Sequence, residues 1–144
     1  MGSDHFRKLE MMYAGAPING FFDPRLSVEE GKTELRMTVR QDFFHAAGAT
    51  HGSVYFKAMD DAAFFAANSL VEDVFVLTTS FNLHLFRPIS AGEMIATGTV
   101  VGQTRSVIVA DSVIHDAEGK QLARGTGTFV RSRMPLTEEM GYRL

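Results

Sequence analysis

The stretch that most constrains this chain runs from His51 to Leu70. It holds no proline and one early glycine, and it is rich in helix-forming residues, so it predicts a single helix of about four or five turns. Apolar residues occupy every side of that helix, and a helix that is apolar all round is normally buried all round. We therefore expect this helix at the centre of the fold, with the rest of the chain wrapped around it.

Two adjacent carboxylates lie in the middle of this helix. A buried carboxylate without a partner is costly or takes up a proton. Lys57 precedes Asp61 by four residues and shares its face, so Asp61 has a local ion-pair partner. Asp60 has only Phe56 and Phe64 at that spacing. Two interpretations of Asp60 stay open: a backbone amide or hydroxyl from elsewhere satisfies it, or it is held in an apolar cleft as a catalytic base or nucleophile.

Composition excludes several classes of protein. The 144 residues fit one domain, and 45% hydrophobic with 22% charged residues is ordinary for a globular chain. A net charge of −3 gives no reason to expect nucleic acid or an anionic membrane as a partner. The absence of cysteine excludes disulfides and thiolate chemistry. With no signal peptide and no membrane span, we expect a cytoplasmic protein, and no histidine pair has the spacing of a helical zinc site.

The rest of the chain predicts mostly strands. Residues 3–14 predict a short amphipathic helix, 17–22 a short extended piece, and 29–32 a turn. Clean alternation predicts a strand over 32–40 with one wet face. Short turns between the later strands make them antiparallel, and the tail 134–144 predicts no element. The later strands are predicted at 74–86, 92–101, 106–115 and 121–131.

This order of one strand, a long helix and a meander of four strands predicts an α+β fold. A curled antiparallel sheet of five or six strands has to wrap around the central helix, with the short N-terminal helix outside. One sheet leaves part of such a helix bare, so we expect a second copy of the chain to complete the burial.

Four short motifs follow one another along the chain, and together they resemble a known family. They are Gly48-x-x-His51-Gly52-Ser53 with Asp60 nine residues after the histidine, Ser80-Phe81-Asn82-Leu83, Arg87-Pro88-Ile89 with Gly92, and Gly125-Thr126-Gly127-Thr128-Phe129-Val130. Their order and spacing, over about residues 31–131, resemble the hotdog-fold acyl-CoA thioesterases of the PaaI-like group. The resemblance implies one hotdog domain over 1–144 that hydrolyses a medium-chain or aromatic acyl-CoA.

The same resemblance implies roles for individual residues. Asp60 matches the acidic base or nucleophile of the central helix, and Gly52 matches the glycine whose N–H polarises the thioester carbonyl. Thr78 matches a hydroxyl residue that positions water. His45 falls near the same carbonyl, where relatives often carry Asn or Gln, and Ser53 replaces a second glycine usual in the family.

Helix geometry adds a constraint on these roles. The N-terminus of a helix presents free amides and a positive dipole end, which suit a developing oxyanion. Gly52 and Asp60 are eight residues apart, roughly 12 Å along the axis, so one helix cannot bring both to the same carbonyl. Two antiparallel helices of a dimer can, with Gly52 and His45 of one chain facing Asp60 and Thr78 of the other.

Further substrate contacts are expected at a second set of positions. Arg105 is a candidate for the coenzyme A phosphates, and His51 is also explained as a helix cap. Among the other histidines, His84 is expected to be packed or at an interface, and His5 and His115 to be at the surface. The expected substrate-binding set is His51, Ser53, Phe64, Asn82 and Arg105.

The resemblance also implies binding partners, and two alternative functions stay open. The partners are acyl-CoA and a second copy of the chain, as a dimer or a dimer of dimers, and no cofactor is expected beyond the coenzyme A of the substrate. One alternative is a non-catalytic acyl-CoA-binding protein. The other is an enoyl-thioester hydratase, but the Asp and His five residues apart that such enzymes use are not apparent.

Overall fold

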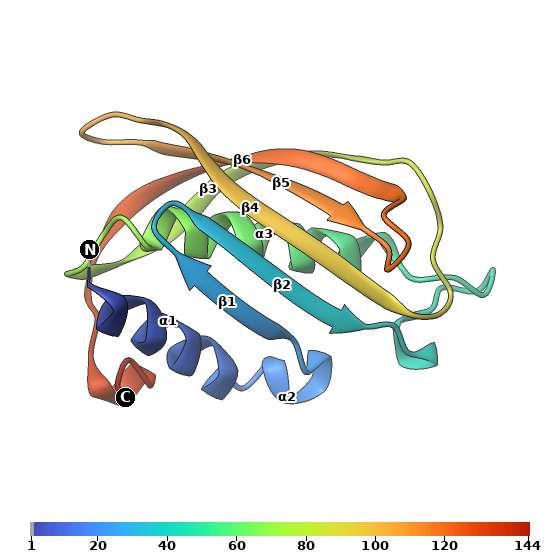
Figure 1. The fold of residues 1–144 in the computed structure, drawn as a ribbon, viewed down its shortest axis with the longest axis horizontal. Helices are drawn as coiled ribbons and strands as arrows, with labels where there is room; N and C mark the ends of the chain where they lie inside the picture. Colours follow the sequence, from blue (N-terminus) through green and yellow to red (C-terminus); the bar gives the residue numbers. More distant parts are fainter. Residues whose placement is uncertain (1) are drawn as a thin grey trace.

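A curled six-stranded antiparallel sheet wraps around one long helix, α3, in the computed structural model, which describes residues 2–144 (Figure 1). This confirms the predicted fold class, including the short N-terminal helix. The elements in chain order are α1 (Ser3–Gly15), α2 (Asn19–Phe22), β1 (Arg25–Glu29), β2 (Lys32–Thr38), the 3₁₀ turn η1 (Gln41–Phe43), α3 (Gly52–Asn68), β3 (Val74–Leu85), β4 (Glu93–Gln103), β5 (Ile108–His115), β6 (Gln121–Pro135) and the 3₁₀ turn η2 (Glu138–Met140).

Helix α3 packs closely on the inner face of the sheet. Ala58, Met59 and Ala62 are fully buried, as the all-round apolar pattern predicts. At Gly98 on β4, a side-chain carbon would lie 2.2 Å from the carbonyl oxygen of Ala62, so only glycine permits this approach. Thr33 of β2 donates a hydrogen bond to the same carbonyl at 2.6 Å. The helix is therefore held against the sheet by both close packing and a polar contact.

The strand order differs from the expected meander. The sheet runs β1-β2-β4-β5-β6-β3, so β3 pairs with β6, the last strand, and not with β4, the next strand along the chain. Two strands precede α3, because the five-residue β1 was missed. Alternation within a segment predicts that a strand exists, but the neighbour it pairs with depends on contacts between distant segments.

The two edge strands of the sheet, β1 and β3, differ in whether another element of the chain covers them. At the β1 edge, α1 supplies side-chain partners: Arg7 donates to the carbonyl of Val28 at 2.6 Å, and Glu10 accepts from its N–H at 2.7 Å. The β1–β2 hairpin turns at the predicted 29–32 position, with Gly31 at a φ of 69°. At the other edge, no further strand within residues 2–144 pairs with β3. The β3 edge is thus available to another chain.

The segment after α1 is helical where an extended piece was predicted. Residues 19–22 form one helical turn, because Asn19 is held by tertiary contacts that its local sequence does not reveal. Its side chain is 5% exposed, donates to the carbonyl of Tyr13 at 2.6 Å and accepts from Lys57 at 2.8 Å. These contacts fix the segment against α3.

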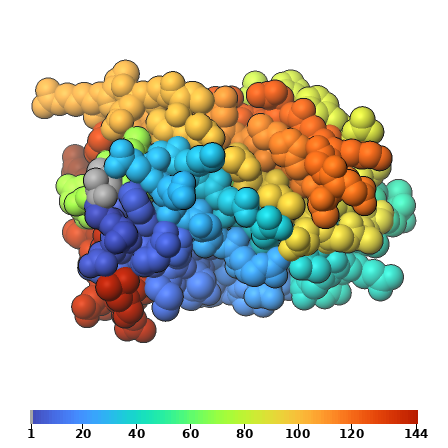
Figure 2. Space-filling model, viewed as in Figure 1, coloured from blue at the N-terminus to red at the C-terminus, as the bar shows by residue number. Residues whose placement is uncertain are grey.

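The N-terminal helix and the C-terminal tail lie side by side, at the lower left of Figure 2. His5, predicted at the surface, is buried instead: its ring nitrogens contact the Tyr142 hydroxyl at 2.6 Å and the Asn68 carbonyl at 3.0 Å. The tail also has more structure than predicted, since β6 extends to Pro135 and η2 follows it. Both corrections arise because the two ends of the chain pack on each other.

Candidate functional site

Asp60 and Thr78 meet in the space between α3 and β3. The Thr78 hydroxyl donates a hydrogen bond to Asp60 Oδ1 at 2.8 Å. This confirms the prediction that a hydroxyl from elsewhere in the chain contacts Asp60. A single hydroxyl leaves the other carboxylate oxygen free, so the contact is also compatible with a reactive acid.

Two features of the chain aim Thr78 at the helix. Asn68, at the end of α3, is fully buried and ties the helix to the start of β3: its amide donates to the carbonyls of Val71 and Val74, and its oxygen accepts from the N–H of Val76 at 3.0 Å. Further along β3, the pairing with β6 shifts at a bulge next to Thr78. Bulges re-aim side chains and are common beside active sites.

The surroundings of Asp60 raise the pKa of its carboxyl above the ordinary value. Burial, the largest cause, raises its pKa from an ordinary 3.8 to about 6. The Thr78 hydrogen bond lowers the pKa, the neighbouring Asp61 charge raises it, and Lys57 lowers it again. A carboxylate with this pKa is mostly ionised at pH 7, yet basic enough to accept a proton from water.

Asp61 is held through one carboxylate oxygen by an ion pair and a hydrogen bond. Lys57 donates to Asp61 Oδ2 at 2.6 Å, as the spacing of four residues predicts. Tyr13 donates to the same oxygen at 2.5 Å. Burial and the Asp61 charge raise the pKa of Tyr13, so its hydroxyl remains protonated and continues to donate. Asp61 is thus a structural anchor, whereas Asp60 is only lightly held.

Asp60 opens into a largely apolar hollow, here called the acid pocket. Its volume is about 350 Å³, and its walls come from the N-terminal segment, α3 and β3. The lining residues are Met12, Tyr13, Ala16, Ile18, Asn19, Lys57, Asp60, Asp61, Phe64, Phe65, Phe75, Leu77 and Thr78. Apolar walls with a few convergent polar groups are typical of ligand sites.

Gly52 and His45 lie in a separate hollow, here called the amide pocket, of about 370 Å³. Its lining residues are His45, Thr50, Gly52, Tyr55, Leu85, Phe86, Arg87 and Pro88. Within residues 2–144, the N–H of Gly52 has no acceptor, as expected for the first residue of a helix. His45 Nδ1 accepts from the N–H of Ala47 at 3.0 Å, so the neutral ring carries its proton on Nε2.

The predicted catalytic residues therefore form two pairs in one chain. Asp60 and Thr78 share the acid pocket, Gly52 and His45 share the amide pocket, and none of the described residues 2–144 lines both. This division agrees with the roughly 12 Å that eight residues span along a helix. Within one protomer, the Asp60–Thr78 pair and the Gly52–His45 pair therefore lie in different hollows.

The residues expected to bind substrate are spread more widely. His51 caps α3, its Nδ1 accepting from the N–H of Ser53 at 3.0 Å, and both line a third hollow beside Phe21 and Phe22. The cap explanation of His51 is confirmed. The signal for it was its place directly before the first helical residue.

Of the other three, only Phe64 lies beside Asp60. It is buried and lines the acid pocket. Asn82 on β3 is exposed and alternates with Phe81, whose ring packs on Phe56 of α3, so the Asn82 side chain points to the opposite face of the sheet. Arg105 lies in the projecting turn between β4 and β5 (Figure 1), where its carbonyl accepts from Arg131 at 2.9 Å. His84, expected to be packed or at an interface, is exposed in the single chain.

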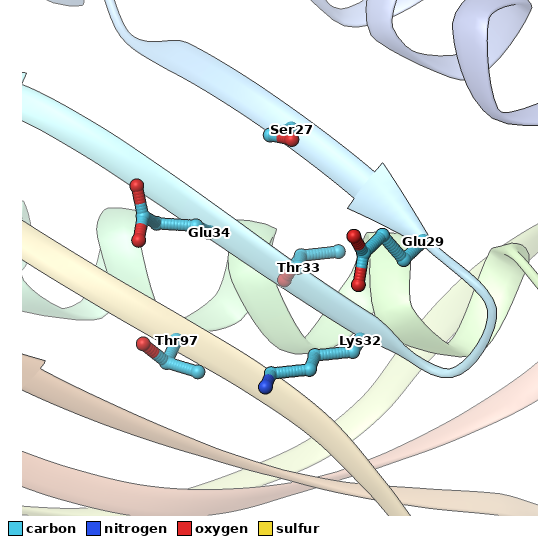
Figure 3. Close-up of a pocket in the computed structure, with 6 residues that line it drawn as sticks. All are labelled: Ser27, Glu29, Lys32, Thr33, Glu34 and Thr97. Carbon is cyan, nitrogen blue, oxygen red and sulfur yellow. The ribbon is translucent and has the colours of Figure 1, made fainter.

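A further hollow on the outer face of β1, β2 and β4 is polar (Figure 3). Glu29, Lys32 and Glu34 line it, and Glu34 forms an ion pair with Arg36 at 2.9 Å. Within residues 2–144, no cluster of three or more His, Cys, Asp or Glu is arranged to hold a metal ion, and no helix there is long and apolar enough to span a membrane.

Sequence reasoning missed the contribution of the N-terminal segment to the acid pocket. Tyr13 and Asn19 reach Asp61 and Lys57 from more than 35 residues away in the chain. In the sequence, Tyr13 falls within the predicted amphipathic helix over 3–14, and Asn19 falls within the predicted extended piece over 17–22. No local pattern signals a contact of this kind.

The chain is similar in fold and sequence to several known proteins. The PaaI protein of E. coli, from the phenylacetic acid degradation operon, superposes with a TM-score of 0.84 at 22% identity, over 93% of this chain and 97% of that one. A thioesterase family protein from Silicibacter pomeroyi gives a TM-score of 0.79 at 25% identity, over 86% and 95%. A curated protein of Saccharolobus solfataricus, provisionally named an esterase, is 23% identical over 128 residues, 88% of this chain and 91% of that protein.

The sequence model of one family also matches the centre of the chain. It is described as the thioesterase superfamily, and it matches residues 47–123, more than half of the 144 residues. The matched segment contains α3, β3, β4 and β5, and hence Asp60, Thr78 and Gly52. The chain therefore belongs to the thioesterase superfamily, and it has the hotdog fold that it shares with the E. coli PaaI protein.

Proposed function

We propose that this protein hydrolyses the thioester bond of an acyl-CoA that carries a medium-chain or aromatic acyl group. Membership of the thioesterase superfamily supports thioester hydrolysis in general. The observation that carries the finer proposal is Asp60, an acid in an apolar pocket with one hydroxyl partner and a pKa raised to about 6. The origin of the E. coli PaaI protein, the phenylacetic acid degradation operon, supports including aromatic acyl groups.

The active site of this proposal forms between two protomers. Three features support a dimer on the α3 and β3 side: the unpaired β3 edge, the separation of the two pockets, and exposed apolar side chains. Phe56, Leu77, Leu85 and Phe86 are 40%, 41%, 47% and 55% exposed. Antiparallel α3 helices would bring the acid pocket of one protomer against the amide pocket of its partner. The face of the sheet turned away from α3 would then be left to join two such dimers into a dimer of dimers.

The reaction then needs only groups already described. Ionised Asp60 removes a proton from a water molecule held by Thr78, and the water oxygen attacks the thioester carbonyl carbon. Alternatively Asp60 attacks the carbonyl directly, and water opens the resulting anhydride. In either route the carbonyl oxygen gains negative charge, which Gly52 N–H and His45 Nε2–H of the partner stabilise. The C–S bond breaks, and coenzyme A leaves as its thiolate and takes up a proton.

A thiol-release assay tests the proposal. Purified protein is mixed with a panel of acyl-CoA esters, from acetyl to dodecanoyl and including phenylacetyl, and free thiol is followed with a chromogenic reagent. We expect turnover whose kcat/KM rises with pH through about 6, as Asp60 loses its proton. Tight binding of the same esters without thiol release, equal in wild type and Asp60→Asn, would favour the non-catalytic alternative.

A further inference from the structure

The segment from the end of α1 to the start of α2 forms one wall of the acid pocket. Met12, Tyr13, Ala16, Ile18 and Asn19 all line it, facing the residues of α3 and β3 across the hollow. None of these five has a role in the proposed reaction. A role for this wall in substrate choice rests on the proposed function, because it requires the acyl group to occupy this hollow.

The polar groups of this wall are already used to hold it in place. Tyr13 donates to Asp61 at 2.5 Å, and Asn19 accepts from Lys57 at 2.8 Å and donates to the Tyr13 carbonyl at 2.6 Å. With its polar groups engaged, the wall therefore offers a ligand mainly apolar surface, from Met12, Ala16 and Ile18. A pocket of this kind favours an uncharged, apolar acyl group, because a polar one would lose its hydration without gaining a partner.

The size of the hollow sets the scale of that group. Its volume is about 350 Å³. A closed apolar cavity of about 150 Å³ is known to hold benzene. The acid pocket therefore has room for an aromatic ring or for an alkyl chain of greater bulk.

Ala16 is the position of the wall at which a substitution can most reduce the size of the hollow. It is half-buried and has the smallest side chain of the lining, so any larger residue at this position would project into the space. Its backbone, at φ −64° and ψ 134°, accepts any L-residue. Ile18 is 56% exposed although it lines the hollow, which places it at the rim.

We propose that Ala16 and Ile18, between α1 and α2, determine the acyl specificity of this protein by limiting the length of the hydrocarbon group that fits beside Asp60. The bulk of the side chain at position 16 sets the depth available, and the side chain at position 18 sets the opening. Acyl groups too short to reach this wall should bind and react equally well whatever the side chains at positions 16 and 18.

Chain-length preference tests the proposal. In Ala16→Phe, the ratio of kcat/KM for octanoyl-CoA to that for acetyl-CoA should fall at least 10-fold. In Ile18→Ala, which widens the opening, the same ratio should rise about 3-fold. Ala14→Phe is the matched control. Ala14 lies on the exposed face of α1, outside the acid pocket, so the same substitution there should leave the ratio unchanged.

Binding of S-alkyl-CoA thioethers, which cannot be hydrolysed, separates this proposal from the proposed function. Titration calorimetry measures the Kd of each thioether. Ala16→Phe should raise the Kd of S-octyl-CoA at least 10-fold relative to that of S-ethyl-CoA, even if the protein hydrolyses no ester. An unchanged octyl-to-ethyl ratio in a folded Ala16→Phe protein, together with an unchanged ratio in Ile18→Ala, would overturn the proposal whether or not the protein is a thioesterase. A melting curve establishes folding.

Discussion

Asp60 and Asp61 are chemically identical neighbours on one helix, yet the structure holds them in opposite ways. Asp61 accepts from both Lys57 and Tyr13 and so has its charge compensated. Asp60 has one hydroxyl partner in an apolar pocket, which raises its pKa to about 6. The difference shows that the position on the helix, together with the partners that α1 and β3 supply, decides which carboxylate has its charge compensated and which is only lightly held.

The sharpest test of this contrast is activity. Asp60→Asn removes the base or nucleophile and should lower kcat/KM about 1,000-fold, close to 4 kcal/mol of transition-state stabilisation. Asp61→Asn keeps the reacting group and should lower it less than about 10-fold at a temperature where the protein is folded. Steady-state thiol release measures both, and equal losses would erase the functional distinction between the two residues.

Stability should respond in the reverse order. Asp61→Asn leaves the ammonium of Lys57, 12% exposed, without its carboxylate, so we expect a loss of about 3 kcal/mol, roughly 10 °C in Tm. Asp60→Asn removes a charge that is costly to bury and should raise the free energy of unfolding by about 1–2 kcal/mol at pH 8.

The pH dependence of the Asp60→Asn gain follows from linkage. The folded-state pKa lies above the unfolded value, so ionisation favours the unfolded chain as pH rises from about 4 to about 6. The gain over wild type should be absent below about pH 4 and complete above about pH 6. A constant gain across that range in chemical denaturation would mean that Asp60 is not a buried, titrating acid.

The smallest expected effect concerns the partner of Asp60. Thr78→Val removes the hydrogen bond that lowers the pKa of Asp60, so the rising limb of the kcat/KM profile should move to higher pH. We expect about a 5-fold loss at pH 7. Thr79→Val is the matched control, because Thr79 donates to the Thr128 carbonyl and not to Asp60. Matching profiles in both variants would show that Thr78 acts only through its place in β3.

Local patterns predicted much of this arrangement. The central helix, the Lys57–Asp61 pair and the buried face of β2 follow from periodicities within single segments. The pairing of β3 with β6 and the helical turn at 19–22 were not predicted, because they depend on contacts between distant segments. The N-terminal wall of the acid pocket belongs to the same group, since Tyr13 and Asn19 reach α3 only in the folded chain.

In the proposed active site, Asp60 of one protomer acts with the backbone amide of Gly52 of the partner protomer. Gly52→Pro deletes that amide at a position where proline suits the helix: Gly52 is the first helical residue, and His51 before it has the extended backbone that proline requires. Gly52→Ala, which keeps the N–H, is the matched control. On their own, Gly52→Pro and Asp60→Asn should both be nearly inactive.

Heterodimers of Asp60→Asn with Gly52→Pro, purified through two different tags, give the most direct measurement. One of their two sites would combine an intact Asp60 with an intact Gly52, so thiol release should recover to about half that of the wild-type dimer. Activity that stays at the level of the two inactive parents would contradict the account.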